Sequence, residues 1–297
     1  MPAGVRYGVI ATARYASAHL VSGRSTRSAR AVRRRQDAAL ARAGAGGPAE
    51  EISVTPVEFM SEGTPVQAVL YRRRELRDRV PALVVSTGAG RNLTGLEWLS
   101  LPLARRGYVV LTQRFRESGT RFHPRDDEDI ANGISYLERL PDVDARRVGI
   151  AGRSRGGAAV LRTAAKDARV RSTAALCGPT DYERWTRGIQ HYSPRSYASA
   201  IKRYGVAPDD DPEYYRVISP ISYAGQIKTP VLIVQGASDL QTPPDHAEWM
   251  YDALVAAGNQ RVKLEMLPGL GHAFEDGTGY GFDTVVRLVS RWFADTL

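Results

Sequence analysis

The sequence has very few of the residues that build disulfides, metal sites and membrane spans. Its 297 residues include a single cysteine, Cys177, so no intramolecular disulfide can form and a reducing compartment is expected. No run approaches the roughly 20 apolar residues of a membrane-spanning helix. No cluster of Cys and His has metal-ligand spacing, and neither a dinucleotide fingerprint nor a P-loop occurs. We therefore expect no metal, no cofactor, no membrane partner and a cytoplasmic location.

Acidic residues are almost missing from the first 49 positions. This segment has nine arginines against one acid, Asp37, so it holds +8 of the chain's net charge of +9 and leaves about +1 for residues 50–297. The composition favours a disordered leader, while an organellar transit peptide and an over-long translation start stay open. No aromatic residues alternate with Arg33-Arg34-Arg35, so nucleic-acid binding is not expected. The sequence therefore predicts a basic segment over 1–49 and one folded domain over 50–297.

Strands and helices alternate from about Val66 to the C-terminus, which indicates an α/β domain with a mostly parallel sheet and helices on both faces. An antiparallel hairpin around Glu62-Gly63 is expected to precede it, with strands over 52–59 and 66–73. The further strands are expected at 81–87, 108–112, 147–151, 170–176, 229–236 and 262–267. The helices are expected at about 95–106, 126–140, 155–167, 243–258 and 283–296.

The segment Gly152-Arg153-Ser154-Arg155-Gly156 has the pattern G-x-S-x-G. It follows an apolar run that is typical of a buried strand, and it precedes a run that is typical of a helix. In this strand-turn-helix setting a serine sits on a sharp turn with its hydroxyl held clear of the backbone. We therefore expect Ser154 to be a nucleophile.

Two partners for this serine follow in order along the chain. Asp239 lies in the loop directly after the strand predicted at 229–236, and His272 lies in a Gly-rich loop after the strand predicted at 262–267. A serine hydroxyl needs a base to take its proton, and a carboxylate fixes the tautomer of that base. The order Ser…Asp…His is that of α/β-hydrolases. His246 falls inside the predicted helix after Pro244 and is expected to be a surface or packing residue.

An oxyanion hole is expected beside Ser154. The loop Gly88-Ala89-Gly90 follows an apolar strand at the position where such enzymes supply one backbone N–H. We assign this N–H to Ala89, with Gly90 as the alternative, and we assign the second to Arg155. The side chains of Arg153 and Arg155 would make the mouth of the site basic, unless they turn away and pair with acids.

About 50 residues separate Cys177 from the strand that begins near Thr229, and many of them are aromatic. Connections of this length usually form a lid or a binding loop. We expect a small helical cap over about 182–217 in which Trp185 and Tyr192, together with Gly90, contact substrate. The alternative is a surface excursion whose aromatic rings only pack on the sheet.

The chain from about 83 to 296 resembles the catalytic domain of the prolyl oligopeptidase-like serine hydrolases, which include dipeptidyl and acylaminoacyl peptidases. The resemblance rests on 105–110, 126–148, 219–224, 227–233 and 271–272, in addition to the serine motif. It implies an α/β-hydrolase fold with Ser154, Asp239 and His272 as the catalytic triad.

Three departures from the family pattern bear on the substrate. The family peptidases usually carry a β-propeller ahead of this domain, which 50–80 residues cannot supply. Thr87-Gly88-Ala89 stands where His-Gly-Gly is familiar, and Arg155 follows the serine where many peptidases have an aromatic residue. The predicted function is thus a serine hydrolase that cleaves carboxylic esters or small peptide-like amides. A serine peptidase acting on short oligopeptides and a non-catalytic binding protein remain as alternatives, and the oligomeric state stays open.

Overall fold

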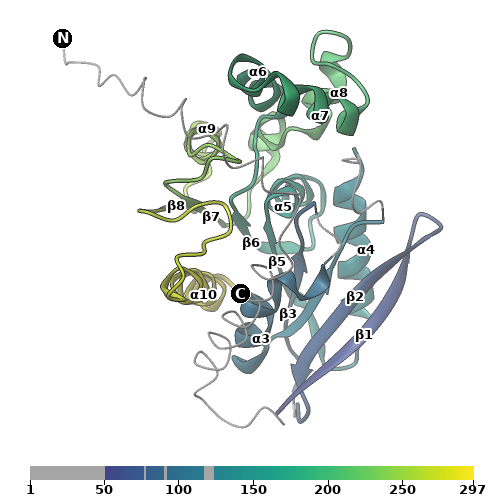
Figure 1. Ribbon diagram of the computed structural model, residues 1–297. Helices are drawn as coiled ribbons and strands as arrows, with labels where there is room; N and C mark the ends of the chain where they lie inside the picture. Colours follow the sequence, from purple (N-terminus) through teal and green to yellow (C-terminus); the bar gives the residue numbers. More distant parts are fainter. Residues whose placement is uncertain (1–50, 77, 90–91, 117–123) are drawn as a thin grey trace, which may run out of the picture.

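Eight strands form one sheet in the computed structural model, which describes residues 51–76, 78–89, 92–116 and 124–297 (Figure 1). They are β1 (Ile52–Ser61), β2 (Thr64–Arg73), β3 (Val80–Ser86), β4 (Val109–Gln113), β5 (Val143–Arg153), β6 (Val170–Leu176), β7 (Val231–Gly236) and β8 (Val262–Leu267). Their order in the sheet is β1-β2-β4-β3-β5-β6-β7-β8. The pairs β1–β2 and β2–β4 are antiparallel, and the other five pairs are parallel. The predicted hairpin and mostly parallel sheet are therefore confirmed.

Helices cover both faces of this sheet. One face carries α3 (Glu97–Arg105), which a short 3₁₀ helix η2 (Leu93–Leu96) precedes, and α10 (Tyr280–Thr296). The other face carries α4 (Asp126–Glu138), α5 (Arg155–Lys166), the 3₁₀ helix η3 (Pro220–Gln226) and α9 (Asp245–Ala256). The five helices predicted at about 95–106, 126–140, 155–167, 243–258 and 283–296 are all present, with ends that differ by up to three residues.

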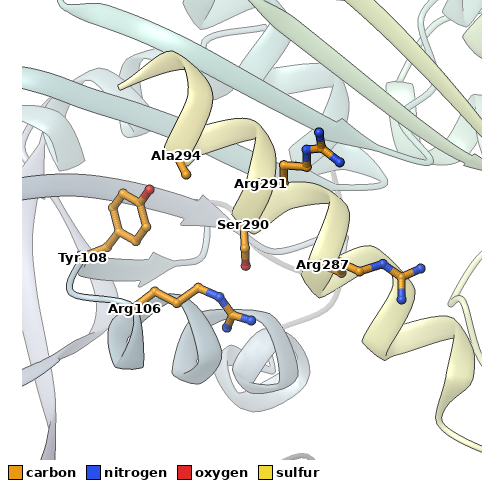
Figure 2. A pocket seen from close by; sticks show the side chains of 6 residues that line it. All are labelled: Arg106, Tyr108, Arg287, Ser290, Arg291 and Ala294. Atoms are coloured by element: carbon orange, nitrogen blue, oxygen red, sulfur yellow. The ribbon is translucent and has the colours of Figure 1, made fainter.

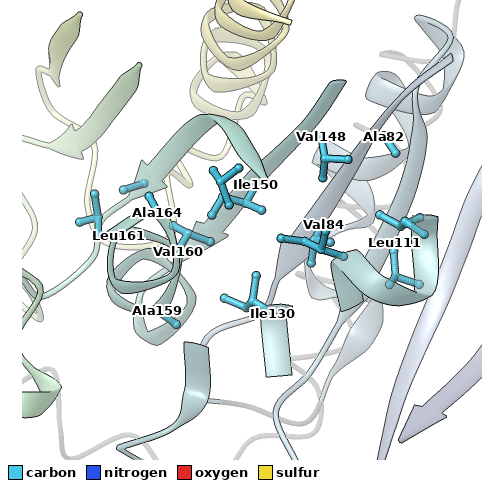
Figure 3. Close-up of a cluster of buried hydrophobic side chains, with 14 of the residues drawn as sticks. Ala82, Val84, Leu111, Ile130, Val148, Ile150, Ala159, Val160, Leu161 and Ala164 are labelled. Atoms are coloured by element: carbon cyan, nitrogen blue, oxygen red, sulfur yellow. The ribbon is translucent and has the colours of Figure 1, made fainter. Parts of the chain in front are cut away.

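The central strands are apolar on both sides because both of their faces are covered. In β3, Val84 packs into the cluster under α4 and α5, whereas its neighbour Val85 packs into the cluster under α3 and α10. Figure 3 shows the first cluster, in which Val84 lies near Ile130 of α4 and Val160 of α5. All of these side chains are fully buried. This two-sided packing holds the ends of the parallel strands at fixed positions.

Three helices fill the long connection between β6 and β7 and group together at one end of the molecule (Figure 1). They are α6 (Tyr182–Tyr192), α7 (Pro194–Tyr204) and α8 (Pro212–Ile218). Each begins at a side chain that accepts a hydrogen bond from a backbone N–H of the first turn: Asp181, Ser193 and Asp211. A helical insert is thus present where the cap was expected, and its role as a cap stays a prediction.

Two further predictions concern the basic N-terminal segment and membrane-spanning helices. The predicted basic segment over 1–49 lies outside the described residues, so the domain boundary near residue 50 stays a prediction. Within the described part of the chain, no helix combines the length and the apolar character that crossing a bilayer requires.

Candidate active site

Ser154 lies on a sharp turn between β5 and α5. Its backbone has φ 59° and ψ −122°, a positive φ that residues other than glycine seldom adopt. The turn closes tightly, since a Cβ at Gly156 would collide with the carbonyl oxygen of Ser86 and a Cβ at Gly152 with the carbonyl of Gly156. The backbone N–H of Ser154 donates to the carbonyl of Leu176 at 2.8 Å. The glycines of the motif are therefore required by close backbone contacts.

A chain of two hydrogen bonds joins Ser154, His272 and Asp239. Oγ of Ser154 lies 2.9 Å from Nε2 of His272, and Nδ1 of His272 lies 2.8 Å from Oδ2 of Asp239. A carboxylate oxygen accepts, so Nδ1 carries the proton and leaves Nε2 to accept from the serine hydroxyl. The Asp239 side chain is fully buried, and that of His272 is 13% exposed. The three residues that the sequence singled out are therefore brought together, and Nε2 can take a proton from Ser154.

Three further N–H groups hold the carboxylate of Asp239. Oδ1 accepts from the backbone of Gln241 at 2.8 Å and of Thr242 at 2.9 Å, and Oδ2 accepts from Nε2 of Gln235 at 3.0 Å. Gln235 is buried near the end of β7. This glutamine was not among the predicted site residues. The signal that could have found it is an amide inside the otherwise apolar strand Val231–Gly236.

Cys177 lies next to the same carboxylate, directly after β6. Cys177, Asp239 and His272 each offer an atom that could bind a metal, and these three atoms lie within 4.8 Å of one another. The Asp239 oxygens already accept hydrogen bonds from four N–H groups, the one on His272 included. Burial, and then the charge of Asp239, raise the pKa of the Cys177 thiol well above its usual value, so a thiolate ligand is disfavoured. This donor set suits proton transfer better than metal binding.

The loop after β3 lies against the nucleophile. A Cβ at Gly88 would lie 3.3 Å from Cβ of Ser154, and Ala89 packs against the aromatic cluster of α6–α8. Arg155 is the first residue of α5, and the first N–H groups of a helix have no acceptor within the helix. Arg155 thus directly follows Ser154, and Ala89 directly follows the glycine that lies against it. The assignment of Ala89 and Arg155 as oxyanion donors stays a prediction. Gly90 lies outside the described residues.

The Arg155 side chain corrects the expectation of a basic mouth. Its guanidinium binds Asp126 through two hydrogen bonds of 2.7 Å, and both side chains are buried. The same group lies over the ring of Phe115, 4.6 Å from its centroid. The charge of Arg155 is thus matched inside the protein rather than offered to a substrate. Arg153 forms no ion pair with any described residue, so the expectation stays open for it.

Trp185 connects the helical insert to the loop of the acid. Its indole N–H donates to the carbonyl of Gln241 at 2.7 Å, and its ring meets the ring of Tyr204 edge-on with centroids 6.3 Å apart. Tyr192 is the last residue of α6, and its side chain lies outside the described part of the structure. Contact of Trp185 or Tyr192 with a substrate therefore stays a prediction.

His246 is buried in α9, as expected for a packing residue. Its Nδ1 accepts a hydrogen bond from the backbone N–H of Thr180 at 3.2 Å, which ties α9 to the loop after β6. Burial lowers the pKa of His246 from 6.5 to about 4, so the ring is neutral at physiological pH. It takes no part in the hydrogen-bonded chain of Ser154.

Comparison with known proteins places this geometry in a family. Residues 97–297 match the model of the prolyl oligopeptidase family. The chain is 26% identical to esterase LipC of Mycobacterium tuberculosis, over 71% of this chain and 58% of that protein. It is 27% identical to the acylamino-acid-releasing enzyme of Rattus norvegicus, over 67% of this chain and 29% of that protein. The chain thus spans less than two thirds of the length of either relative.

A solved structure shares the fold. The puromycin-hydrolyzing peptidase of Mycobacterium tuberculosis superposes with a TM-score of 0.73 at 20% identity, over 86% of this chain and 41% of that one. This likeness and the sheet order confirm the predicted α/β-hydrolase fold. Because the family match covers more than half of the sequence and includes the segments of Ser154, Asp239 and His272, this chain belongs to the prolyl oligopeptidase family and is a serine hydrolase.

Proposed function

We propose that the protein cleaves carboxylic esters or small peptide-like amides through an acyl-enzyme intermediate. The observation that carries this proposal is the hydrogen-bonded chain from Ser154 through His272 to Asp239, with separations of 2.9 and 2.8 Å. It lies at the carboxyl ends of the parallel strands, next to the turn of G-x-S-x-G. Nucleophile, base and orienting acid are thus in the geometry that acyl transfer uses.

In the proposed acylation step, Oγ of Ser154 attacks the substrate carbonyl while Nε2 of His272 takes the hydroxyl proton. The imidazolium that forms is stabilised by the buried Asp239, whose position Gln235, Gln241 and Thr242 fix through their N–H groups. His272 then gives the proton to the leaving alcohol or amine. The C–O or C–N bond breaks as the acyl-enzyme forms.

The negative charge that develops on the carbonyl oxygen needs fixed N–H donors. We assign these to the backbone of Ala89 and Arg155, because Arg155 directly follows Ser154 and Ala89 directly follows Gly88, which lies against it. Donors of this kind typically contribute about 2.7–4 kcal/mol each to transition-state stabilisation. In deacylation, water attacks the acyl group, His272 takes the proton of that water, and Ser154 recovers its own.

Small esters are the substrates that we expect to react fastest. An ester has a better leaving group than an amide, so a less demanding geometry suffices to cleave it. The 26% identity to an esterase supports this choice. The 27% identity to an acylamino-acid-releasing enzyme supports the alternative, a peptidase acting on short oligopeptides. In either case we assign contact with the substrate to Trp185, Tyr192 and Gly90.

Labelling with a fluorophosphonate probe tests the nucleophile. We expect the wild-type protein to be labelled and Ser154→Ala to lose both labelling and turnover, with a fall in rate of about 10⁶, since loss of the serine of subtilisin has an effect of this size. Ser199→Ala, which removes an exposed serine of α7, is the matched control and keeps both. Labelling that survives in Ser154→Ala contradicts the assignment. A wild-type protein that is neither labelled nor active indicates the binding-protein alternative.

A substrate panel separates esterase from peptidase. We compare kcat/KM for p-nitrophenyl esters of increasing acyl length with kcat/KM for aminoacyl p-nitroanilides. Trp185→Ala is expected to change the preference among acyl chains, by about 1–3 kcal/mol per methylene at most. A p-nitroanilide with a higher kcat/KM than every ester establishes the peptidase alternative. Equal effects of Trp185→Ala on all esters would show that the indole only packs.

A further inference from the structure

The indole of Trp185 holds a peptide group of the loop that carries Asp239. Nε1 of Trp185, in the insert helix α6, donates to the carbonyl oxygen of Gln241 at 2.7 Å. That carbonyl belongs to the peptide group that also contains the backbone N–H of Thr242, and this N–H donates to Oδ1 of Asp239 at 2.9 Å. One peptide group thus lies between the insert and the acid of the proposed triad.

This peptide group transmits orientation because it is rigid. Its atoms lie close to one plane, so the carbonyl of Gln241 and the N–H of Thr242 turn together. A donor that fixes the carbonyl therefore also fixes the direction in which the N–H points. Polarisation adds to this effect, since a peptide group whose carbonyl accepts a hydrogen bond donates more strongly through its N–H. The indole of Trp185 thus aims and strengthens a hydrogen bond to Asp239 without touching it.

The chain of hydrogen bonds continues from Asp239 to the proposed nucleophile. Oδ2 of Asp239 lies 2.8 Å from Nδ1 of His272, and Nε2 of His272 lies 2.9 Å from Oγ of Ser154. A displaced carboxylate holds the imidazole less well, and a shift of about 1 Å in a reacting group can lower a rate by about 10². The position of α6 is therefore linked to proton transfer at Ser154.

The loop of Asp239 is held from two sides that differ in burial. On the side of the sheet, Nε2 of the buried Gln235 donates to the carbonyl of Thr242 at 3.0 Å. On the side of the insert, Gln241 is exposed and Trp185 is half-buried. The insert has its own small apolar cluster, so it can open while the sheet stays folded. The hydrogen bond of Trp185 is then lost, while that of Gln235 remains.

We propose that Trp185 is a positioning residue through which the helical insert orients Asp239. The inference rests on the proposed hydrolase function, since it concerns the acid of that triad, and it gives the insert a role in the chemical step besides contact with substrate. Because Asp239 acts on His272 and not on the substrate, loss of the indole N–H should lower kcat by the same factor for every ester. An insert that only binds substrate would instead change KM and the preference among acyl chains.

Trp185→Phe tests this role, because phenylalanine keeps a ring against Tyr204 and removes the indole N–H. On a series of p-nitrophenyl esters we expect kcat to fall about three- to tenfold, the effect expected of one neutral hydrogen bond. KM should change less than about twofold. A kcat within about twofold of the wild-type value, or a loss that varies strongly with acyl length, overturns the proposal.

Trp292→Phe is the matched control. The indole N–H of Trp292 donates to the carbonyl of Thr173 at 3.1 Å, so this variant loses the same kind of bond. Trp292 lies in α10, the helix that carries Arg287 and Arg291 in Figure 2, on the face of the sheet that α3 and α10 cover. It should keep kcat within about twofold. A fall in kcat as large as in Trp185→Phe would show that any lost indole bond slows the enzyme, which contradicts the proposal.

A double-mutant cycle shows whether the indole acts through Asp239. Asp239→Ala removes the carboxylate that accepts from Thr242, so adding Trp185→Phe should lower kcat less than about twofold further. A loss of about three- to tenfold in both backgrounds would mean that the indole acts elsewhere, and it would overturn the proposal. An activated p-nitrophenyl ester keeps the residual rates measurable, and circular dichroism verifies that each variant is folded.

Nuclear magnetic resonance tests the link without any activity. Trp185→Phe identifies the indole N–H signal of Trp185 as the one that it removes from the proton–nitrogen spectrum. Asp239→Ala should shift this signal through the shared peptide group, whereas the indole signals of Trp98 and Trp292, which donate to other carbonyls, should stay in place. A Trp185 signal that does not move overturns the proposal. A wild-type protein without turnover refutes the proposed function, and this measurement then decides alone whether the insert is linked to Asp239.

Discussion

Positive backbone φ angles gather around the proposed nucleophile. Four described residues other than glycine have positive φ, and three of them, Ser154, Cys177 and Phe274, lie in the loops that meet at the site. Such a conformation costs about 1–3 kcal/mol and persists only where the surroundings fix it. For Ser154 the fixing contacts include its N–H bond to Leu176 and its carbonyl bond to Ala158. The strain is thus located where the chemistry is proposed to occur.

The first prediction concerns the acid. Asp239→Asn should lower kcat/KM by about 10⁴, because an amide can hold the imidazole of His272 in the wrong tautomer, as the corresponding change does in trypsin. His246→Gln is the control, since it alters a neighbouring buried histidine outside the hydrogen-bonded chain. It should keep kcat/KM within about fivefold. Steady-state kinetics on one ester measures both, and a loss in His246→Gln as large as in Asp239→Asn would refute the triad.

The second prediction concerns the buried pair of Arg155 and Asp126. Arg155→Met leaves the Asp126 carboxylate buried without a partner, so we expect a loss of about 3–5 kcal/mol in the free energy of unfolding. Asp126→Leu in the same protein removes that charge, and the double variant should recover most of the loss. Urea unfolding of the single and double variants measures these values.

The same variants show whether the pair of Arg155 and Asp126 positions the turn that carries Ser154. Arg155 supplies the backbone N–H next to Ser154, so if α5 moves in Arg155→Met, the variant should lose more in kcat than it gains in KM. Arg155→Lys keeps the charge and should restore part of kcat without the two-bond geometry. A double variant as unstable as Arg155→Met would show that packing against Phe115, rather than charge, accounts for the effect.

At the scale of elements, one tyrosine holds the helical insert together. Tyr204 is fully buried, and its ring contacts four aromatic rings from α6 and α8 at centroid distances of 5.6 to 6.5 Å. Tyr204→Ala should cost about 3–5 kcal/mol of local stability, as other buried aromatic truncations do. Because the insert has its own small cluster of apolar side chains, we expect it to open before the sheet does.

Hydrogen exchange measures this opening. In Tyr204→Ala, amide exchange should rise across α6, α7 and α8 and stay unchanged in β3 and β5. Tyr280→Ala, which removes a tyrosine that is 65% exposed at the start of α10, serves as control and should leave both regions unchanged. A uniform rise in exchange over insert and sheet would mean that the two unfold as one unit.

At the scale of the whole molecule, local patterns in the sequence predicted the order of elements and the residues that meet at the site. Apolar runs and turn residues are local signals, and Ser154, Asp239 and His272 could be found because each follows a strand. Residues that pair with each other although they lie far apart in the sequence could not be found in this way. Asp126 lies in a run of acids typical of any helix start, and nothing local says that it binds Arg155 in a buried pair. For Arg155, the expectation of a basic mouth failed for that reason.

The last prediction follows from His246 and concerns the stability of the molecule in acid. An unfolded histidine has a pKa near 6.5, and burial lowers that of His246 to about 4. Between these values the unfolded chain binds a proton that the folded protein does not, so stability falls as pH falls through this window. At pH 5 the loss from this one residue is about 2 kcal/mol, or roughly 4–8 °C in Tm.

His246→Gln isolates the contribution of this histidine to the pH dependence of stability. The amide oxygen of glutamine can still accept from Thr180, and the variant has no group that titrates in that window. Other carboxylates and histidines affect both proteins alike, so the difference between their Tm values is what matters. We expect that difference to be constant above about pH 7 and to shift in favour of the variant as the pH is lowered to 5. Parallel Tm curves for the two proteins would mean that His246 is protonated in the folded state, and therefore that the contact between α9 and the loop after β6 opens in acid.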